Sequence, residues 1–215
     1  MNIIKHLIVT GIGGFPRELY GYAKDSIGYG TEWDFKGFLD GDKKAPDEEY
    51  DKLPKPLLGD VFSYEIEKND VFVCAVGAPQ VKKRLVEVIA ERGGEFISVI
   101  HKTVIVGENA RIGKGCILCP YSTINSFATM EDHVTLQLYS VIGHDSFVGK
   151  YTSIMGHVSI TGNVHIGELV YMGDSSNVLP HAQIGDEAFV GASSLVLRRV
   201  KKGDKVFGVP ALSVY

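Results

Sequence analysis

The chain has 215 residues, which is enough for one large domain or two small ones. Its hydrophobic content of 45% and charged content of 22% are ordinary for a soluble globular protein, and its net charge of −4 argues against nucleic-acid binding. No apolar run approaches a membrane span, and the apolar part of the N-terminus is too short for a signal peptide. We therefore expect a cytoplasmic protein with no membrane partner.

Strands and helices alternate over the first hundred residues. The expected strands are 3–9, 35–39, 71–76 and 95–100, the expected helices run from 16 to about 26 and from 80 to 92, and 43–56 reads as a polar loop. This alternation predicts a small α/β domain of the Rossmann-like type with a parallel sheet. We place this domain at 1–100 and a second domain at 101–215.

Small residues and one acid follow the ends of three of these strands. Gly11-x-Gly13-Gly14 follows the first strand, Asp40 ends the second and Gly77 follows the third. The carboxyl ends of parallel strands meet at one edge of a sheet, where open α/β sheets bind ligands. Glycines there let backbone N–H groups and a helix N-terminus approach a phosphate. The full dinucleotide spacing is absent, so the turn indicates the pyrophosphate of a nucleotide sugar rather than NAD, or else a purely structural turn.

The three cysteines are Cys74, Cys116 and Cys119. An odd, sparse set is typical of a reducing compartment. Cys116-x-x-Cys119 has the spacing of a metal-ligand pair, but no second pair completes a zinc site. We therefore expect no metal, and we expect Cys116 to be packed inside the protein.

The second half of the chain repeats every six residues. Sixteen aliphatic residues keep this register without a break. They are Val106, Ile112, Leu118, Ile124, Met130, Leu136, Ile142, Val148, Ile154, Ile160, Ile166, Met172, Val178, Ile184, Val190 and Val196. A small or β-branched residue lies two positions before each, so both face inward from a short strand. Glycine often follows the aliphatic residue, where we expect it to allow a sharp corner.

Three such strands close a triangular coil of about 18 residues, so the repeats predict a parallel β-solenoid of about five coils, roughly 25 Å long. Its two open ends need covers, the C-terminal one being the tail after Val196.

This domain order resembles the hexapeptide-repeat acetyltransferases of the NeuD/PglD type, and the likeness covers the whole chain. The motifs that carry it are the glycine turn at 11–14, Gly37-Phe38-Leu39-Asp40, Val76-Gly77, Ile100-His101, Gly143-His144-Asp145 and Phe207-Gly208-Val209-Pro210-Ala211. The resemblance implies a left-handed parallel β-helix, although elementary physics favours right-handed crossovers.

The resemblance also implies an acetyl-CoA-dependent enzyme. Members of this family acetylate an amine or hydroxyl of a sugar used in surface glycans, as homotrimers with each active site between two adjacent β-helices. The nucleotide-like pocket favours N-acetylation of a nucleotide-linked amino sugar. The alternative is O-acetylation of sialic acid or another sugar.

By similarity, His144 is the general base and Asp145 its partner. Spacing alone favours an exposed corner histidine beside an exposed aspartate, with no catalytic role. Gln137 stands where relatives often place asparagine near the base. Ser153 stands where relatives commonly carry a histidine near the thioester, and His157 is a candidate to replace it.

The other expected contacts follow the same resemblance. Acetyl-CoA is expected at Gly173, Asp174, Gly191 and Ala192, and its phosphates at the basic residues Arg198 and Lys201. The sugar nucleotide is expected at Gly11, Gly13, Gly14, Arg17, Asp40 and Gly77.

Two alternatives belong to other functional classes. A zinc lyase of the γ-carbonic-anhydrase type needs three histidines to meet, for which His133, His144 and His157 are available. The paired His-x-x-x-x-His of that family is missing. A non-catalytic scaffold that binds nucleotide sugars is the other alternative.

Overall fold

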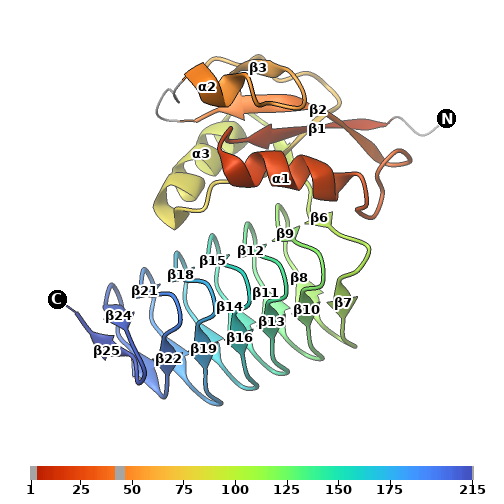
Figure 1. The fold of residues 1–215 in the computed structure, drawn as a ribbon. Coiled ribbons are helices and arrows are strands. Elements are labelled where there is room, and N and C mark those ends of the chain that lie inside the picture. The colour runs from red at the N-terminus through yellow and green to blue at the C-terminus, as the bar shows by residue number, and fades with distance from the viewer. Residues whose placement is uncertain (1–3, 42–46, 215) are drawn as a thin grey trace.

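A parallel sheet with flanking helices lies on one face of a long β-solenoid (Figure 1). This is a computed structural model, and it describes residues 4–41 and 47–214. Within these ranges no helix is both long enough and apolar enough to cross a membrane.

The N-terminal sheet has five parallel strands. They are β1 (Lys5–Thr10), β2 (Trp33–Asp40), β3 (Leu57–Asp60), β4 (Asp70–Cys74) and β5 (Glu95–Phe96). Their order in the sheet is β3-β2-β1-β4-β5, so the chain starts in the middle and builds outward in both directions. The strands expected at 3–9, 35–39 and 71–76 are confirmed within a few residues, and residues 1–3 lie outside the described part. The strand β3 was not predicted.

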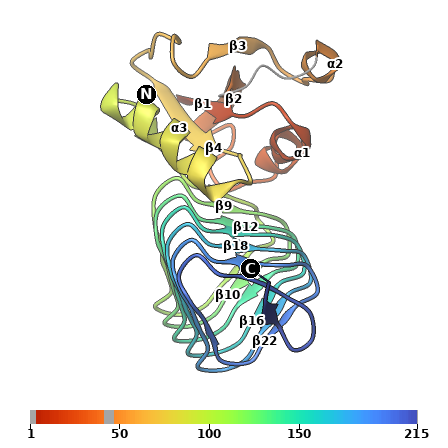
Figure 2. The same cartoon turned by 90° about the vertical axis from the view of Figure 1, so that its left-hand side faces the viewer.

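Two helices cover opposite faces of this sheet, as Figure 2 shows. They are α1 (Gly14–Ala23) and α3 (Pro79–Glu91). Alternate residues of β1 divide between them: Leu7 and Val9 pack in the cluster of α1, and Ile8 packs in the cluster of α3. A strand that is buried on both faces explains why residues 3–9 read as one continuous apolar run.

Two details of this region differ from the expectation. The single-turn helix α2 (Asp47–Tyr50) lies where a loop was expected over 43–56, of which residues 42–46 lie outside the described part. The expected strand 95–100 is two strands, because β5 pairs with β4 whereas β6 (Val99–Ile100) pairs with the solenoid strand beginning at Ile117.

The solenoid has three sheets. The domain-facing sheet contains β6, β9 (Ile117–Leu118), β12 (Thr135–Leu136), β15 (Ser153–Ile154), β18 (Tyr171–Met172), β21 (Phe189–Val190), β24 (Lys205–Phe207) and the antiparallel β25 (Leu212–Ser213). The second sheet contains β7 (Ile105–Val106), β10 (Thr123–Ile124), β13 (Val141–Ile142), β16 (Ser159–Ile160), β19 (Asn177–Val178) and β22 (Leu195–Val196). The third sheet contains β8 (Arg111–Ile112), β11 (Thr129–Met130), β14 (Phe147–Val148), β17 (His165–Ile166), β20 (Gln183–Ile184) and β23 (Arg199–Val200).

The period of six is confirmed as stacked short strands. Residues such as Ile124, Ile142 and Ile166 are fully buried in one continuous core. The stack is longer than the predicted five coils, since the domain-facing sheet holds seven stacked parallel strands, from β6 to β24. It gains β6 before the first hexad, and β23 and β24 within the tail that was expected only to cover its end.

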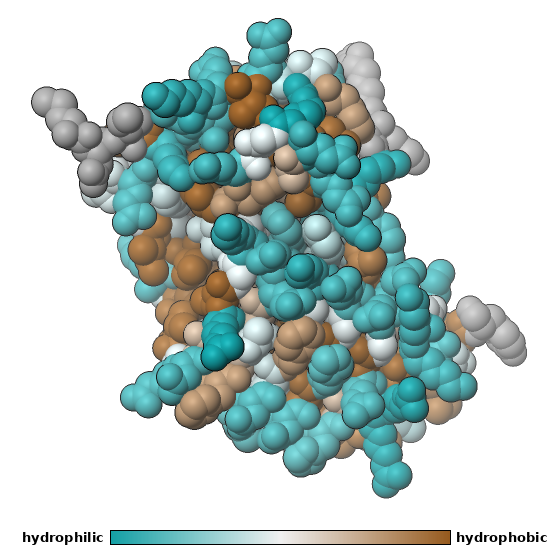
Figure 3. Space-filling model, turned by 180° about the vertical axis from the view of Figure 1, so that it is seen from behind, coloured by the Kyte–Doolittle hydropathy of each residue, from teal (hydrophilic) through white to brown (hydrophobic). Residues whose placement is uncertain are grey.

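The first coil departs from the inward pattern. Val106 is 47% exposed, because β7 is an edge strand with a neighbour on one side only. The N-terminal domain packs on the side of the prism and leaves Val106 and Ile105 of this first coil exposed. Figure 3, seen from behind, shows hydrophobic surface on the side where these first coils lie.

The glycines after the aliphatic residues serve a purpose other than the expected one. The left-handed backbone conformation falls two residues later, on non-glycine residues such as Asp145 (φ 55°) and His157 (φ 57°). Gly143 instead lies against the next coil, where an added Cβ would come within 2.3 Å of the Thr161 backbone. Close approach between coils, not backbone freedom, therefore requires glycine there.

Candidate active site

A pocket of about 500 Å³ opens at the carboxyl ends of β1, β2 and β4. It brings together five residues that the sequence singled out, and the apolar side chains of α3 complete its wall. The five residues are Gly11, Gly13, Gly14, Asp40 and Gly77. The convergence follows from the parallel sheet, since neighbouring strands deliver their C-terminal turns to one edge.

The glycine turn leaves the start of α1 open to a ligand. Gly13 is the N-cap of this helix and makes no side-chain capping bond, so the first N–H groups of α1 keep their donor capacity. A Cβ added at Gly13 or Gly14 would meet no described atom within 4 Å. Gly11 has φ of +108° and lies against Pro16, so it is needed for the turn itself. The arrangement suits an anionic group.

Asp40 lies at the rim of the pocket with both carboxylate oxygens engaged. Oδ1 accepts the backbone N–H of Gly41 at 2.7 Å, and Oδ2 accepts the Tyr50 hydroxyl at 2.5 Å. Tyr50 comes from α2, in the segment that the sequence indicated to be only a polar loop. No sequence signal pointed to it.

Arg17 does not line this pocket. Its guanidinium donates to the Ile12 carbonyl at 3.3 Å and pairs with Glu49 of α2. The hydrogen bond from Arg17 lowers the pKa of the Glu49 carboxyl. Arg17 therefore links α1 to α2 behind the glycine turn.

His144 lies at the corner between β13 and β14, far along the chain from the pocket. Its Nδ1 is 2.7 Å from Oδ2 of Asp145, and the two side chains are 61% and 51% exposed. A carboxylate can only accept, so Nδ1 carries the hydrogen and Nε2 is left as the basic nitrogen. Gly162 of the next coil makes room for the ring, since a Cβ there would lie 2.4 Å from Nε2.

The pocket and the imidazole of one chain do not face each other. The N-terminal domain packs on the domain-facing sheet (Figure 2). His144 lies between β13 and β14, at the corner of the second and third sheets, opposite that sheet. Gln137 lies at another corner, between β12 and β13, and His157 lies at the same corner one coil further on. The structure therefore does not bring Gln137 or His157 to His144 within one chain.

The corner of Gln137 and His157 carries a column of residues with stacked rings. Tyr121 stacks on Tyr139 with ring centroids 5.2 Å apart, and Tyr139 stacks on His157 at 5.0 Å. Ser175 and Ser193 continue this column on the following coils, and the expected acetyl-CoA residues Asp174 and Ala192 directly precede them. Gly173 and Gly191 begin the same turns, directly after β18 and β21. Four of the predicted contacts thus share one corner.

The remaining residues that were expected to contact acetyl-CoA do not lie together. Ser153 is fully buried beneath α3, so its hydroxyl faces no surface groove. Lys201 lines a small cavity of about 200 Å³ on the third sheet with Arg199 and Lys202, but Arg198 does not line it. Of the two basic residues expected at the phosphates of CoA, only Lys201 therefore lies in this cavity.

The three histidines of the zinc alternative occupy three different corners. His133 lies between β11 and β12, packed against Phe96 and stacked on Tyr151. Burial lowers the pKa of His133 to about 4. Among residues 4–41 and 47–214, no group of three metal-binding side chains is close enough to hold an ion.

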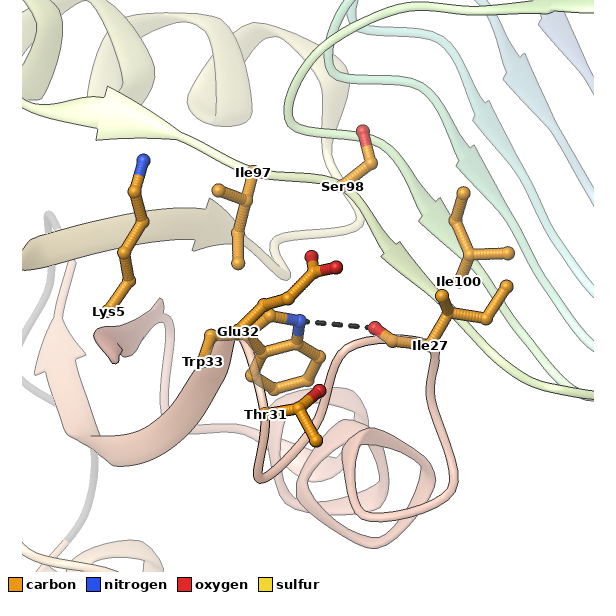
Figure 4. A pocket seen from close by; sticks show the side chains of 8 residues that line it. All are labelled: Lys5, Ile27, Thr31, Glu32, Trp33, Ile97, Ser98 and Ile100. Carbon is orange, nitrogen blue, oxygen red and sulfur yellow. Dashed lines mark hydrogen bonds between the residues drawn. The ribbon is translucent and has the colours of Figure 1, made fainter. Parts of the chain in front are cut away.

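Two further hollows were not predicted. One, of about 560 Å³, separates the start of α3 from the solenoid and is lined by Gly77, Pro79, Tyr171 and Phe189. Its Gly77 is shared with the pocket at the glycine turn. The other, of about 450 Å³, lies at the amino ends of β1 and β2, where the Trp33 indole N–H donates to the Ile27 carbonyl (Figure 4).

No protein-family model matches the chain. Solved structures match it over almost its whole length. The acetyltransferase domain of PglB from Neisseria gonorrhoeae, in complex with acetyl coenzyme A, is 21% identical, with 98% of this chain and 100% of that one covered and a TM-score of 0.85. WeeI from Acinetobacter baumannii is 22% identical, with the same coverage and a TM-score of 0.84.

A third structure is a mutant of perosamine N-acetyltransferase from Caulobacter crescentus in complex with CoA and GDP-perosamine. It is 20% identical, with 99% of this chain and 98% of that one covered and a TM-score of 0.86. The chain therefore shares the fold of these acetyltransferases from end to end.

Proposed function

We propose that the protein is an acetyl-CoA-dependent N-acetyltransferase that acts on a nucleotide-linked amino sugar in surface glycan biosynthesis. The observation that carries this proposal is the His144–Asp145 pair, with Nδ1 held by a carboxylate and Nε2 free, in a chain that also carries an anion-suited pocket. The shared fold supports it, since relatives with this fold were solved with acetyl-CoA, or with CoA and GDP-perosamine.

The chemistry needs one base. The amine of the sugar attacks the thioester carbon, the new C–N bond forms, and Nε2 of His144 takes the proton that the amine loses. The C–S bond then breaks, and the same proton passes to the departing thiolate of CoA. Asp145 holds the ring in the productive tautomer and stabilises the imidazolium that forms.

The nucleotide is assigned to the N-terminal domain, residues 1–100. The strand order β3-β2-β1-β4-β5 supports a Rossmann-like domain, whose ligands bind where the strand order reverses. The pyrophosphate would lie on the N–H groups at the start of α1, and Asp40 would accept hydrogen bonds from the ribose or base. The solenoid, residues 101–215, is proposed to be left-handed like that of the family it resembles.

The base is assigned to a neighbouring copy of the chain. The pocket and His144 of one chain lie on opposite sides of the prism, so a site that uses both needs a second solenoid. In a cyclic trimer each interface joins two different surfaces. The corner of His144 on one copy can therefore meet the corner of Gln137 and His157 on the next, with the acetyl-CoA between them.

This arrangement keeps most of the expected acetyl-CoA contacts. Gly173, Asp174, Gly191 and Ala192 line the corner of Gln137, and the basic residues Arg198 and Lys201 follow the last hexad, where they suit the phosphates of CoA. Ser153 is left out because α3 buries it. The buried free cysteines fit a cytoplasmic enzyme.

A panel of acceptors tests the proposal. Thiol release from acetyl-CoA is measured with UDP-, GDP- and dTDP-linked amino sugars, and with free and CMP-linked sialic acid. We expect turnover with one of the amino sugars and a product acetylated on nitrogen. Turnover only with sialic acid would establish the O-acetyltransferase alternative, and no thiol release with any acceptor would contradict the enzyme.

A further inference from the structure

Lys82, on α3, is fully buried at the junction between the N-terminal domain and the solenoid. Its Nζ donates to the hydroxyls of Ser153 at 2.8 Å and Thr135 at 3.0 Å. It also donates to the carbonyls of His133 at 3.3 Å and Thr152 at 3.4 Å. No carboxylate of the described residues is among these partners, so four neutral oxygens hold the ammonium.

A buried amine without a counter-ion is costly, because its charge loses the solvation of water. Burial lowers the pKa of Lys82 to about 8, and the thiols of Cys74 and Cys116 oppose this shift only in part. Packing alone would be served better by an apolar side chain of the same length. The amine therefore contributes directional hydrogen bonds, which an apolar side chain would not make.

The two hydroxyl acceptors of Lys82 lie on two neighbouring strands, β12 and β15. The outward position of the domain-facing sheet is occupied in turn by Val99, Ile117, Thr135, Ser153, Tyr171, Phe189 and Lys205. Only Thr135 and Ser153 offer a small hydroxyl. A slip of α3 by one strand, about 4.8 Å along the solenoid, would replace one of the two hydroxyls with Ile117 or Tyr171.

The two strands that hold Lys82 bracket one particular coil. The chain leaves the domain-facing sheet after Thr135, turns at the corner of His144 and returns at Ser153. The helix α3 also carries the walls of the glycine-turn pocket, through Val81 and Leu85. In a trimer whose axis runs along the solenoids, equivalent coils of the three copies lie at one height, so the pocket of one copy is level with the imidazole of the next.

We propose that Lys82 is a positioning residue that sets the height of the nucleotide-binding domain along the solenoid, at the coil that carries His144. Directional hydrogen bonds to Thr135 and Ser153 select this height over neighbouring ones. This inference rests on the proposed function for its effect on catalysis, but the placement of the domain can be measured without any activity.

The kinetic test compares Lys82→Met with Lys83→Met. Lys83 is the adjacent residue of α3, with a side chain 42% exposed, and its only described ion pair is a loose one with Glu87 at 3.8 Å. We expect kcat to fall about 10-fold or more in Lys82→Met, because a shift of about 1 Å is enough to misalign the amine and the thioester. The Kd of the free nucleoside diphosphate and the KM of acetyl-CoA should stay within about twofold of wild type, since the pocket and the solenoid are each intact. Lys83→Met should match wild type throughout.

A second variant guards against simple unfolding. Lys82→Met leaves two hydroxyls without a donor, which Thr135→Val and Ser153→Ala remove. The triple variant should regain the thermal stability of wild type but keep the low kcat, because apolar contacts do not select a height. Wild-type kcat in this triple variant would overturn the proposal, as would a parallel loss of nucleotide affinity in Lys82→Met.

A distance measurement separates this inference from the proposed function. Spin labels are attached at Glu91→Cys on α3 and Lys114→Cys on the solenoid, both exposed, in protein diluted with unlabelled chain. The interdomain distance distribution should broaden or shift in the Lys82→Met and triple variants and stay sharp in Lys83→Met. An unchanged distribution would overturn the positioning role, whereas a changed one would support it even in a protein that transfers no acetyl group.

Discussion

The two halves of the molecule encode their structure differently. In the solenoid each strand is specified by its own hexad, and pairing partners lie one coil away in the sequence. In the N-terminal domain β1 pairs with strands from two distant segments, and its helices are placed by side-chain packing. The repeat builds similar corners on every coil, so a site arises only where a corner carries a reactive side chain, as at His144. In the N-terminal sheet, the parallel topology brings the turns after several strands together into one site, as at the glycine turn.

The largest expected effect comes from removing the imidazole of His144, which tests the solenoid half of the site. His144→Ala should lower kcat by a factor of about 10² or more while the fold and assembly are unchanged, because the amine loses its base. The matched control is His181→Ala, which removes an exposed histidine two coils further along the same corner. Steady-state kinetics and size-exclusion chromatography measure both. Wild-type turnover in His144→Ala would remove this residue from the mechanism.

The next largest effect comes from the other half of the site. Gly13→Asp places a carboxylate where the pyrophosphate is expected, and aspartate is a favourable N-cap, so α1 should form normally. We expect acceptor KM to rise about 10-fold or more through charge repulsion, with acetyl-CoA KM unchanged. Gly13→Ser is the uncharged N-cap control and should stay near wild type. Equal behaviour of the two variants would contradict a phosphate at this turn.

A smaller effect is expected at the rim of the pocket. Asp40→Ala removes one acceptor for the ribose or base, which is worth about 1 kcal/mol, so acceptor KM should rise roughly 5- to 10-fold. The value of kcat should change much less, since Asp40 is remote from the reacting atoms. An unchanged KM would remove the nucleotide from the end of β2.

The smallest effect is a slope in stability with pH. The pKa of Lys82 is about 8 in the folded protein, below its ordinary value of 10.5, so between these pH values the unfolded chain binds more protons. The free energy of unfolding should therefore gain a positive contribution as pH rises from about 8 to 10.5. Buried thiols such as Cys74, whose pKa burial raises to about 11, oppose this trend above pH 9. The slope is therefore read as the difference between wild type and Lys82→Met in urea denaturation.

How much the sequence could predict differs between the two regions for the same physical reason. Hexads with an inward aliphatic residue need only local register to specify a solenoid, and the glycine turn and Asp40 meet because parallel strands end at one edge. Tyr50 escaped prediction because α2 is a single turn in a polar segment. Lys82 escaped because its acceptors lie 53 and 71 residues away, and nothing near it in the chain marks it as buried.

The sequence could predict that His144 lies at an exposed corner of the solenoid. It could not predict that this corner would form only half of the proposed active site. Its position opposite the N-terminal domain depends on which face of the prism that domain covers. That face is selected by packing contacts such as those of Ile117 and Leu138 with the apolar cluster around β1. These contacts appear only when the chain is folded.

The most direct test of the account is complementation between two impaired chains. His144→Ala and Gly13→Asp subunits are co-expressed and purified as mixed assemblies, and transfer is measured at low acceptor concentration. A site built from the pocket of one copy and the imidazole of the next should be restored in roughly a quarter of positions in a random trimer, so activity should return to about that fraction of wild type. Mixed assemblies no more active than the separate variants would show that the two halves do not meet across copies, and would contradict the account.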